Sequence, residues 1–159
     1  MTRPAIRDAT PADATAISDL VCRVAGDTIF AEGPDDGRRY FMAMNAPAAT
    51  AGKLSDSAYR YHVAEQDGRI VGMVAMRGNA HVYHLFVDTS MHGTGLGRAL
   101  WEHAREVCRR NGNHGRYTVD ATPDTVGFYE RFGFQVSGAL GVRNGHPALP
   151  MKLEPQYRN

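Results

Sequence analysis

The chain has 159 residues, of which 43% are hydrophobic; this can bury one core but hardly two, so we expect a single domain over residues 1–159. The formal net charge of +1 comes with scattered Lys and Arg residues and no basic stripe, which argues against a nucleic-acid-binding protein. The lack of a membrane-length apolar stretch and of a signal-peptide core predicts a cytoplasmic protein with no membrane partner.

The N-terminal half is predicted to contain a strand, two helical segments and a hairpin. Residues 5–7 predict a first strand, and residues 10–13 form a helix start ahead of apolar positions at helical spacing. Residues from 35 to about 53 predict a second helix, which the Asn45-Ala46-Pro47 sequence should bend or break. Residues 61–64 and 69–76 flank an Asp-Gly pair and predict a β-hairpin.

The C-terminal half is predicted to supply the central strand and the strands that follow it. Residues 81–87 predict the central strand, and residues 117–121, 134–138 and 148–153 predict three later ones. Helical patterns alternate with these strands. The order predicts an α/β fold, with a central mixed, twisted sheet of about six to seven strands flanked by about four helices.

The most informative segment runs from the end of the central strand through a glycine-spaced turn into a helix. Gly93, Gly95 and Gly97 lack the Cβ atoms that would keep a ligand away from the backbone, so successive N–H groups can converge on an anion. Arg98 adds a positive charge beside them. The helix is supported by apolar residues at three- and four-residue spacing, namely Leu96, Ala99, Leu100, Ala104, Val107 and Cys108. The segment predicts a phosphate-binding loop.

Two common phosphate-binding motifs do not fit this loop. It lacks the Lys-Ser/Thr pair of a P-loop, and Gly97 comes one position too early for a dinucleotide-binding fingerprint. Because Asp120 ends a plausible strand downstream, a Rossmann-type nucleotide-binding domain stays open as a minor alternative.

At these residues the chain resembles the GNAT superfamily of acyl-CoA N-acyltransferases. The family signature is an apolar-x-apolar strand end, a short turn, and Gln/Arg-x-x-Gly-x-Gly/Ala opening a helix. Leu85 and Val87 supply the apolar pair, Gly95 and Gly97 match, and His92 replaces Gln or Arg while still able to cap the loop. The resemblance implies that the diphosphate of coenzyme A is held by the N–H groups of Gly93, Thr94, Gly95, Leu96, Gly97 and Arg98.

A second segment, residues 119–134, resembles the GNAT strand, short helix and Tyr-x-x-x-Gly-Phe ending. The resemblance implies that Tyr129 protonates the departing CoA thiolate, and that a backbone N–H near Phe86 or Val87 stabilises the oxyanion. Asp120 replaces an Asn that is common in the family. Because a carboxylate only accepts hydrogen bonds, its contact with the pantetheine amides must differ from that of Asn.

A general base must take the proton of the attacking amine. His81 is the first candidate, because resembling acetyltransferases often carry Glu or His at the start of this strand, and His84 is the second. We expect no metal at this His-x-x-His pair. The odd offset places the two rings on opposite faces of a regular strand, and no cluster of other ligands accompanies them.

These residues predict an acyltransferase that moves an acetyl group from acetyl-CoA to an amine by direct transfer in a ternary complex. Neither motif holds a cysteine that could form an acyl-enzyme. A non-catalytic acyl-CoA-binding or sensing module stays open as an alternative from another class. The acceptor, a small-molecule or protein amine, has no diagnostic pattern, and pairing through sheet edges would allow a homodimer.

Overall fold

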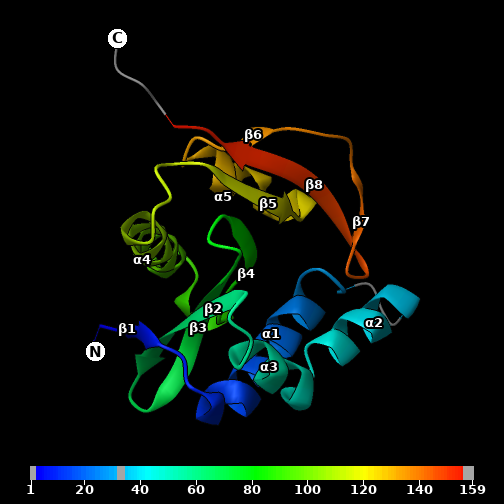
Figure 1. Ribbon diagram of the computed structural model, residues 1–159. Helices are drawn as coiled ribbons and strands as arrows, with labels where there is room; N and C mark the ends of the chain where they lie inside the picture. The colour runs from blue at the N-terminus through cyan, green and yellow to red at the C-terminus, as the bar shows by residue number, and fades with distance from the viewer. Residues whose placement is uncertain (1–2, 32–34, 156–159) are drawn as a thin grey trace.

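The structure is a computed structural model that describes residues 3–31 and 35–155 (Figure 1). Its described residues form the strands β1 (Ala5–Asp8), β2 (Tyr59–Gln66), β3 (Arg69–Arg77), β4 (His81–Val87), β5 (Tyr117–Ala121), β6 (Gln135–Val136), β7 (Gly141–Arg143) and β8 (His146–Leu153). The α-helices are α1 (Ala14–Asp27), α2 (Asp36–Met44), α3 (Pro47–Leu54), α4 (Leu96–Arg110) and α5 (Val126–Glu130). Single 3₁₀ turns cover Pro11–Asp13, Thr89–Met91 and Pro123–Thr125.

The strands form one mixed sheet in the order β1-β2-β3-β4-β5-β8-β6, with β7 paired to β8. The β2–β3 hairpin turns at Asp67 and Gly68, whose φ angles of 52° and 78° suit a type I′ turn. Among the described strands, β4 and β5 are the one parallel pair, and the other pairs are antiparallel. A Rossmann-type domain needs a largely parallel sheet, so that alternative is wrong.

The mixed α/β class is confirmed. The break expected at Asn45-Ala46-Pro47 is confirmed too, because Ala46 is extended (ψ 159°) and Pro47 begins a new helix, and the described residues form five α-helices rather than about four. The described residues also form eight strands rather than six to seven. The added strand is β7, which is short and exposed and carries no apolar alternation, although the Asn144-Gly145 pair that follows it is a hairpin signal.

The two faces of the sheet are covered by different helices (Figure 1). On one face, α4 buries the side chains of Leu100, Trp101 and Ala104. On the other face, α1 buries Ile17 and Leu20. Full burial of each such Leu or Ile contributes about 1.5–3 kcal/mol, which fixes the sheet between the two helical layers. None of the described helices combines the length and the apolar character needed to cross a bilayer.

The sheet opens between β4 and β5. Pairing between these strands, over the described residues, is limited to His81 with Thr118 and Val82 with Val119. Beyond that point the strands separate, and Figure 1 shows β5, β6 and β8 diverging from β1–β4. In β4, Tyr83 is an extra residue opposite the β3 pair Ala75 and Met76, which is a β-bulge. Divergence and bulge together create an opening between β4 and β5.

Candidate active site

A cleft of about 520 Å³ occupies the gap between β4 and β5. Its lining includes the end of β4, the loop that opens α4, the end of β5, and α5. Both segments that carry the sequence motifs therefore reach the same cavity. Of the predicted site residues, the cleft is lined by Phe86, Val87, His92, Gly93, Gly95, Leu96, Gly97, Arg98, Asp120, His84 and Tyr129.

The loop after β4 presents backbone N–H groups to this cleft. Gly93 and Gly95 have φ angles of 77° and 86°, in the left-handed region that favours glycine. The first hydrogen bond of α4 runs from the Ala99 N–H to the Gly95 carbonyl, so the N–H groups of residues 96–98 precede the helical ladder. Such donors, at the positive end of the helix dipole, are able to bind an anion.

Two side chains hold the base of this loop in place. Asp88 accepts hydrogen bonds from the backbone N–H and hydroxyl of Ser90, and it pairs with Arg23 at 2.9 Å. The Ser90 N–H, and then Arg23, lower the pKa of Asp88 to about 2, so the carboxylate is ionised at neutral pH. Thr94 turns back and donates its hydroxyl to the Met91 carbonyl. The loop is therefore shaped before any ligand binds.

His92 also tethers the loop to the sheet. Its Nε2 lies 3.0 Å from the Val87 carbonyl oxygen. A carbonyl only accepts, so Nε2 carries the hydrogen and donates it. His92 thus supports the turn at the position where the family signature has Gln or Arg.

The loop packs closely against α5 at Gly97. A Cβ atom on Gly97 would lie 3.3 Å from Cε2 of Phe128. The ring of Phe128 in turn packs edge-on against Tyr129, with centroids 5.1 Å apart. The absence of a side chain at Gly97 therefore lets α4 and the tyrosine-bearing helix approach each other.

Tyr129 is almost completely buried and lines the cleft. Its ring also packs against Phe134, with centroids 5.4 Å apart. Burial raises the pKa of Tyr129 above its usual range, because the phenolate would be poorly solvated. The side chain is a protonated phenol at neutral pH and can act as a proton donor.

His81 and Asp120 come together at the point where β4 and β5 still pair. His81 Nδ1 lies 2.8 Å from the Thr118 hydroxyl, and His81 Nε2 lies 3.7 Å from Asp120 Oδ2. Burial, followed by the charge of Arg77, lowers the pKa of His81. The histidine is therefore neutral at neutral pH, and Asp120 connects it to the cleft.

His84 belongs to a buried polar group that we call the Asn45 cluster, made of Ser18, Phe41, Asn45, Thr50 and His84. His84 Nε2 lies 2.9 Å from Asn45 Oδ1, and Asn45 Nδ2 donates to the Phe41 carbonyl at 3.0 Å. The Asn45 carbonyl accepts from the hydroxyls of Ser18 and Thr50.

Within this cluster His84 is a poor proton acceptor. Burial, followed by the charge of Lys53, lowers its pKa to about 3. Sequence reasoning identified Asn45 only as part of a helix break and did not find its bond to His84. The available signal was the presence of a polar residue, Asn45, at a helix break, because backbone groups that are buried at a break need hydrogen-bond partners.

A family model described as an acetyltransferase (GNAT) domain matches residues 29–155. The acetyltransferase Atu2258 of Agrobacterium fabrum is 40% identical over 74 residues, which cover 46% of this chain and 53% of that protein. The peptidyl-lysine N-acetyltransferase YjaB of Escherichia coli is 34% identical over 72 residues, or 45% of this chain and 46% of that protein. The chain spans about half the length of these curated relatives.

The fold has close counterparts among solved structures. The PaiA N-acetyltransferase from Thermoplasma acidophilum, solved in complex with coenzyme A, matches with a TM-score of 0.82 at 14% identity, covering 99% of this chain and 100% of that one. That similarity concerns the fold. Because the GNAT model matches most of the sequence, the chain belongs to the GNAT acetyltransferase family.

Proposed function

We propose that this protein is an N-acetyltransferase that moves an acetyl group from acetyl-CoA to an amine within a ternary complex. One observation carries the proposal. The N–H groups at the start of α4 and the buried phenol of Tyr129 line one cleft. A single ligand could therefore have its anionic group bound by the N–H groups and its leaving group protonated by the phenol. The coenzyme A complex of the PaiA relative supports the choice of ligand.

In this mechanism the loop binds the cofactor. The N–H groups of Gly93 and of residues 95–98 donate hydrogen bonds to the diphosphate of coenzyme A, and Arg98 adds charge beside them. The Thr94 N–H, which was also expected to take part, bonds to the Met91 carbonyl instead. The pantetheine arm lies in the gap between β4 and β5, where both strands have unpaired edges. Asp120, at the cleft end of β5, accepts a hydrogen bond from a pantetheine amide.

The strand geometry favours Val87 over Phe86 as the oxyanion donor. The Asp88 N–H bonds to the Val71 carbonyl on β3, and N–H directions alternate along a strand. The Val87 N–H therefore points to the opposite edge, toward the gap. The bulge at Tyr83 explains this direction. Val82 pairs with β5, and the extra residue Tyr83 shifts by one position the alternation of N–H directions along the rest of β4, so the Val87 N–H faces the gap.

Proton transfers complete the reaction. The amine nitrogen attacks the thioester carbon, the carbon–sulfur bond breaks, and the thiolate takes a proton from the Tyr129 hydroxyl. The amine proton passes to the base, for which His81 behind Asp120 is the first choice. His84 is the second choice, since its pKa of about 3 and its bond to Asn45 make it a weak acceptor.

The test combines ligand binding with turnover. Thermal midpoints are measured with acetyl-CoA, CoA, NAD and ATP, because a ligand of the native state raises the midpoint by mass action. A panel of small amines, amino acids and lysine peptides is then assayed for CoA release. Midpoint shifts with acetyl-CoA and CoA alone, together with turnover of at least one amine, support the proposal. No shift with either compound contradicts it.

The panel also separates the proposal from the non-catalytic alternative. A protein that binds acetyl-CoA but acetylates no amine is an acyl-CoA-binding or sensing module. The chain's organisation as one domain, its cytoplasmic location, its lack of nucleic-acid partners and its pairing as a homodimer stay predictions from the sequence.

A further inference from the structure

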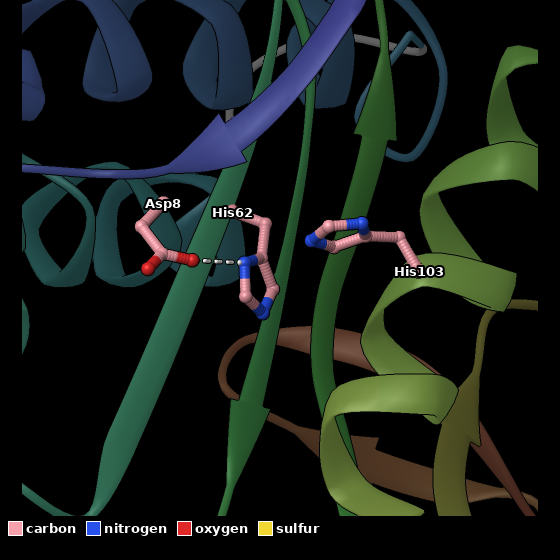
Figure 2. A group of neighbouring side chains, drawn as sticks. All are labelled: Asp8, His62 and His103. Carbon is pink, nitrogen blue, oxygen red and sulfur yellow. Dashed lines mark ion pairs between the residues drawn. The ribbon is translucent and has the colours of Figure 1, made fainter. Parts of the chain in front are cut away.

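A second group of ligand-type side chains lies away from the cleft. Asp8 ends β1, His62 lies in β2, and His103 lies in the middle of α4 (Figure 2). One possible ligand atom from each residue lies within 4.8 Å of the others. Asp8 and His62 face each other directly in the β1–β2 pairing, and α4 covers that face of the sheet. Figure 2 shows the ring of His103 directed toward His62.

His62 has an unusual position for a polar side chain. Its relative exposure is 0%, and over the described residues neither ring nitrogen has a hydrogen-bond partner. Burial of a polar group without a partner costs about 1–3 kcal/mol, so buried imidazoles are normally bonded. By contrast, buried His84 has Asn45 as its partner. The unpartnered ring of His62 therefore needs an explanation.

Asp8 and His103 both approach the His62 ring closely. His62 Nδ1 and Asp8 Oδ1 are 3.0 Å apart, yet the contact does not have the direction of a hydrogen bond. The rings of His62 and His103 meet edge to face, with centroids 4.7 Å apart and an interplanar angle of 77°, which leaves their nitrogens close without stacking.

We propose that Asp8, His62 and His103 bind a zinc ion that joins β1 and β2 to α4. Two imidazoles and one carboxylate are a usual zinc ligand set, with a fourth position for water. Zinc bonds of about 2.0–2.2 Å in a tetrahedron place ligand atoms roughly 3.3–3.6 Å apart. The separation of 3.0 Å between His62 Nδ1 and Asp8 Oδ1 and the upper limit of 4.8 Å for all three ligand atoms lie on either side of this range.

The surroundings suit an incoming ion. The Asp8 carboxylate is 86% exposed and His103 is half-buried, so the site is open to solvent on one side. Over the described residues the ring nitrogens of His62 have no hydrogen-bond partner, so they remain available to a metal ion. Nitrogen ligands favour zinc over Mg²⁺ and Ca²⁺, which prefer oxygen.

This site was not expected from the sequence, where only the His81 and His84 pair was considered and no metal was predicted. The three ligands come from separate segments with no motif spacing. The proposal does not depend on the acetyltransferase function, because none of the three residues is among those that line the cleft.

The experiment measures zinc binding directly. The full chain is stripped of metal with a chelator and titrated with Zn²⁺ against a chromophoric competitor, with Mg²⁺ and Ca²⁺ as parallel titrants. We expect one Zn²⁺ per chain and a thermal midpoint that rises with Zn²⁺. Asp8→Ala and His103→Ala should each weaken Zn²⁺ binding at least about tenfold, because each removes one ligand.

Matched controls use residues outside the cluster. Asp19→Ala and His114→Ala replace exposed residues of the same types and should leave Zn²⁺ affinity unchanged. Far-UV circular dichroism checks each fold, and His103→Gln replaces His103→Ala if the latter is unstable. Absence of Zn²⁺ binding would overturn the proposal, and so would binding that persists equally in the cluster variants and the controls. In either case Asp8, His62 and His103 form only an ion pair and a ring contact.

Discussion

One part of the cleft lining is made from the backbone of a single segment, residues 87–98, whereas Phe41 and His84 reach the cleft from the Asn45 cluster, whose side chains come from separate helices and from β4. The loop depends on glycine conformations and on bonds between near neighbours such as His92 and Val87. The Asn45 cluster depends on bonds between residues far apart in sequence, such as Asn45 and His84. The loop has two contacts with distant residues, from Asp88 to Arg23 and from Gly97 to Phe128, whereas every side-chain bond of the Asn45 cluster to another helix or to β4 depends on the packing of those elements.

The largest expected effect concerns the phenol beside the loop. Tyr129→Phe should lower kcat by about 100-fold or more, because a general acid contributes that much to leaving-group departure. The ring contacts with Phe128 and Phe134 remain, so the Kd for CoA should change by less than about twofold. Steady-state kinetics and calorimetry measure the two quantities.

Tyr40→Phe is the matched control, because Tyr40 is 51% exposed on α2. If Tyr129→Phe and Tyr40→Phe had equal kcat values, Tyr129 would have no part in the chemical step.

The next effect concerns the contribution of the Asn45 cluster to the stability of the fold. Asn45→Ala leaves the buried His84 Nε2–H without its acceptor and removes the amide donor to the Phe41 carbonyl. We expect the free energy of unfolding to fall by about 2–3 kcal/mol, measured by urea denaturation. The control is Asn111→Ala, since Asn111 makes a similar amide bond to the Val107 carbonyl from an exposed position. A loss of about 0.5 kcal/mol is expected there, and equal losses would mean that burial adds nothing.

Acid should act on the same cluster through His84. The pKa of His84 is about 3 in the folded protein against 6.5 for an ordinary histidine, so the unfolded chain binds more protons between these values. The stability from a neutral His84 is present above pH 6.5 and is lost as the pH falls toward 3. Between pH 7 and pH 5 this loss should be about 2 kcal/mol.

The variant His84→Gln should remove that part of the pH dependence, while the exposed His114→Gln keeps it. Urea denaturation at both pH values gives the comparison. If the free energy of unfolding of His84→Gln fell between pH 7 and pH 5 as much as that of the unmodified protein, His84 would not be the cause of this pH dependence.

On the loop side, Gly97→Val tests the close approach to α5. The added side chain meets Phe128, so the start of α4 must shift and the N–H groups with it. The Kd for CoA should rise at least about tenfold, which equals about 1.4 kcal/mol. Gly52→Val in α3 is the control, because a Cβ atom there has nothing within 4 Å. Equal CoA affinity in the two variants would argue against a diphosphate bound at this loop.

The smallest expected effect concerns charge. The Arg98 side chain is 70% exposed and pairs with Glu102 at 3.0 Å. Arg98→Ala should raise the Kd for CoA by only a few fold at low salt, and the difference should shrink as salt is added. Arg110→Ala, at the far end of α4, should have no effect. A salt-independent loss would indicate that Arg98 acts through the shape of the loop.

Much of the fold could be predicted because its signals are local. The Asp67-Gly68 turn, the central strand and the start of α4 follow from short-range patterns and are confirmed. The helix break before Pro47 is also confirmed. β7 was missed because its residues are exposed and show no alternation, so the only signal was in the turn that follows it.

The sequence by itself determined the fold family and the glycine-spaced turn between β4 and α4, because those features depend on residues within single continuous segments. Only the tertiary structure decided which polar side chains meet. Strand register places Asp8 against His62 and His81 beside Thr118, and helix packing brings Asn45 to His84 and His103 to His62. Such contacts depend on how whole elements pack, and no short stretch of sequence encodes that packing.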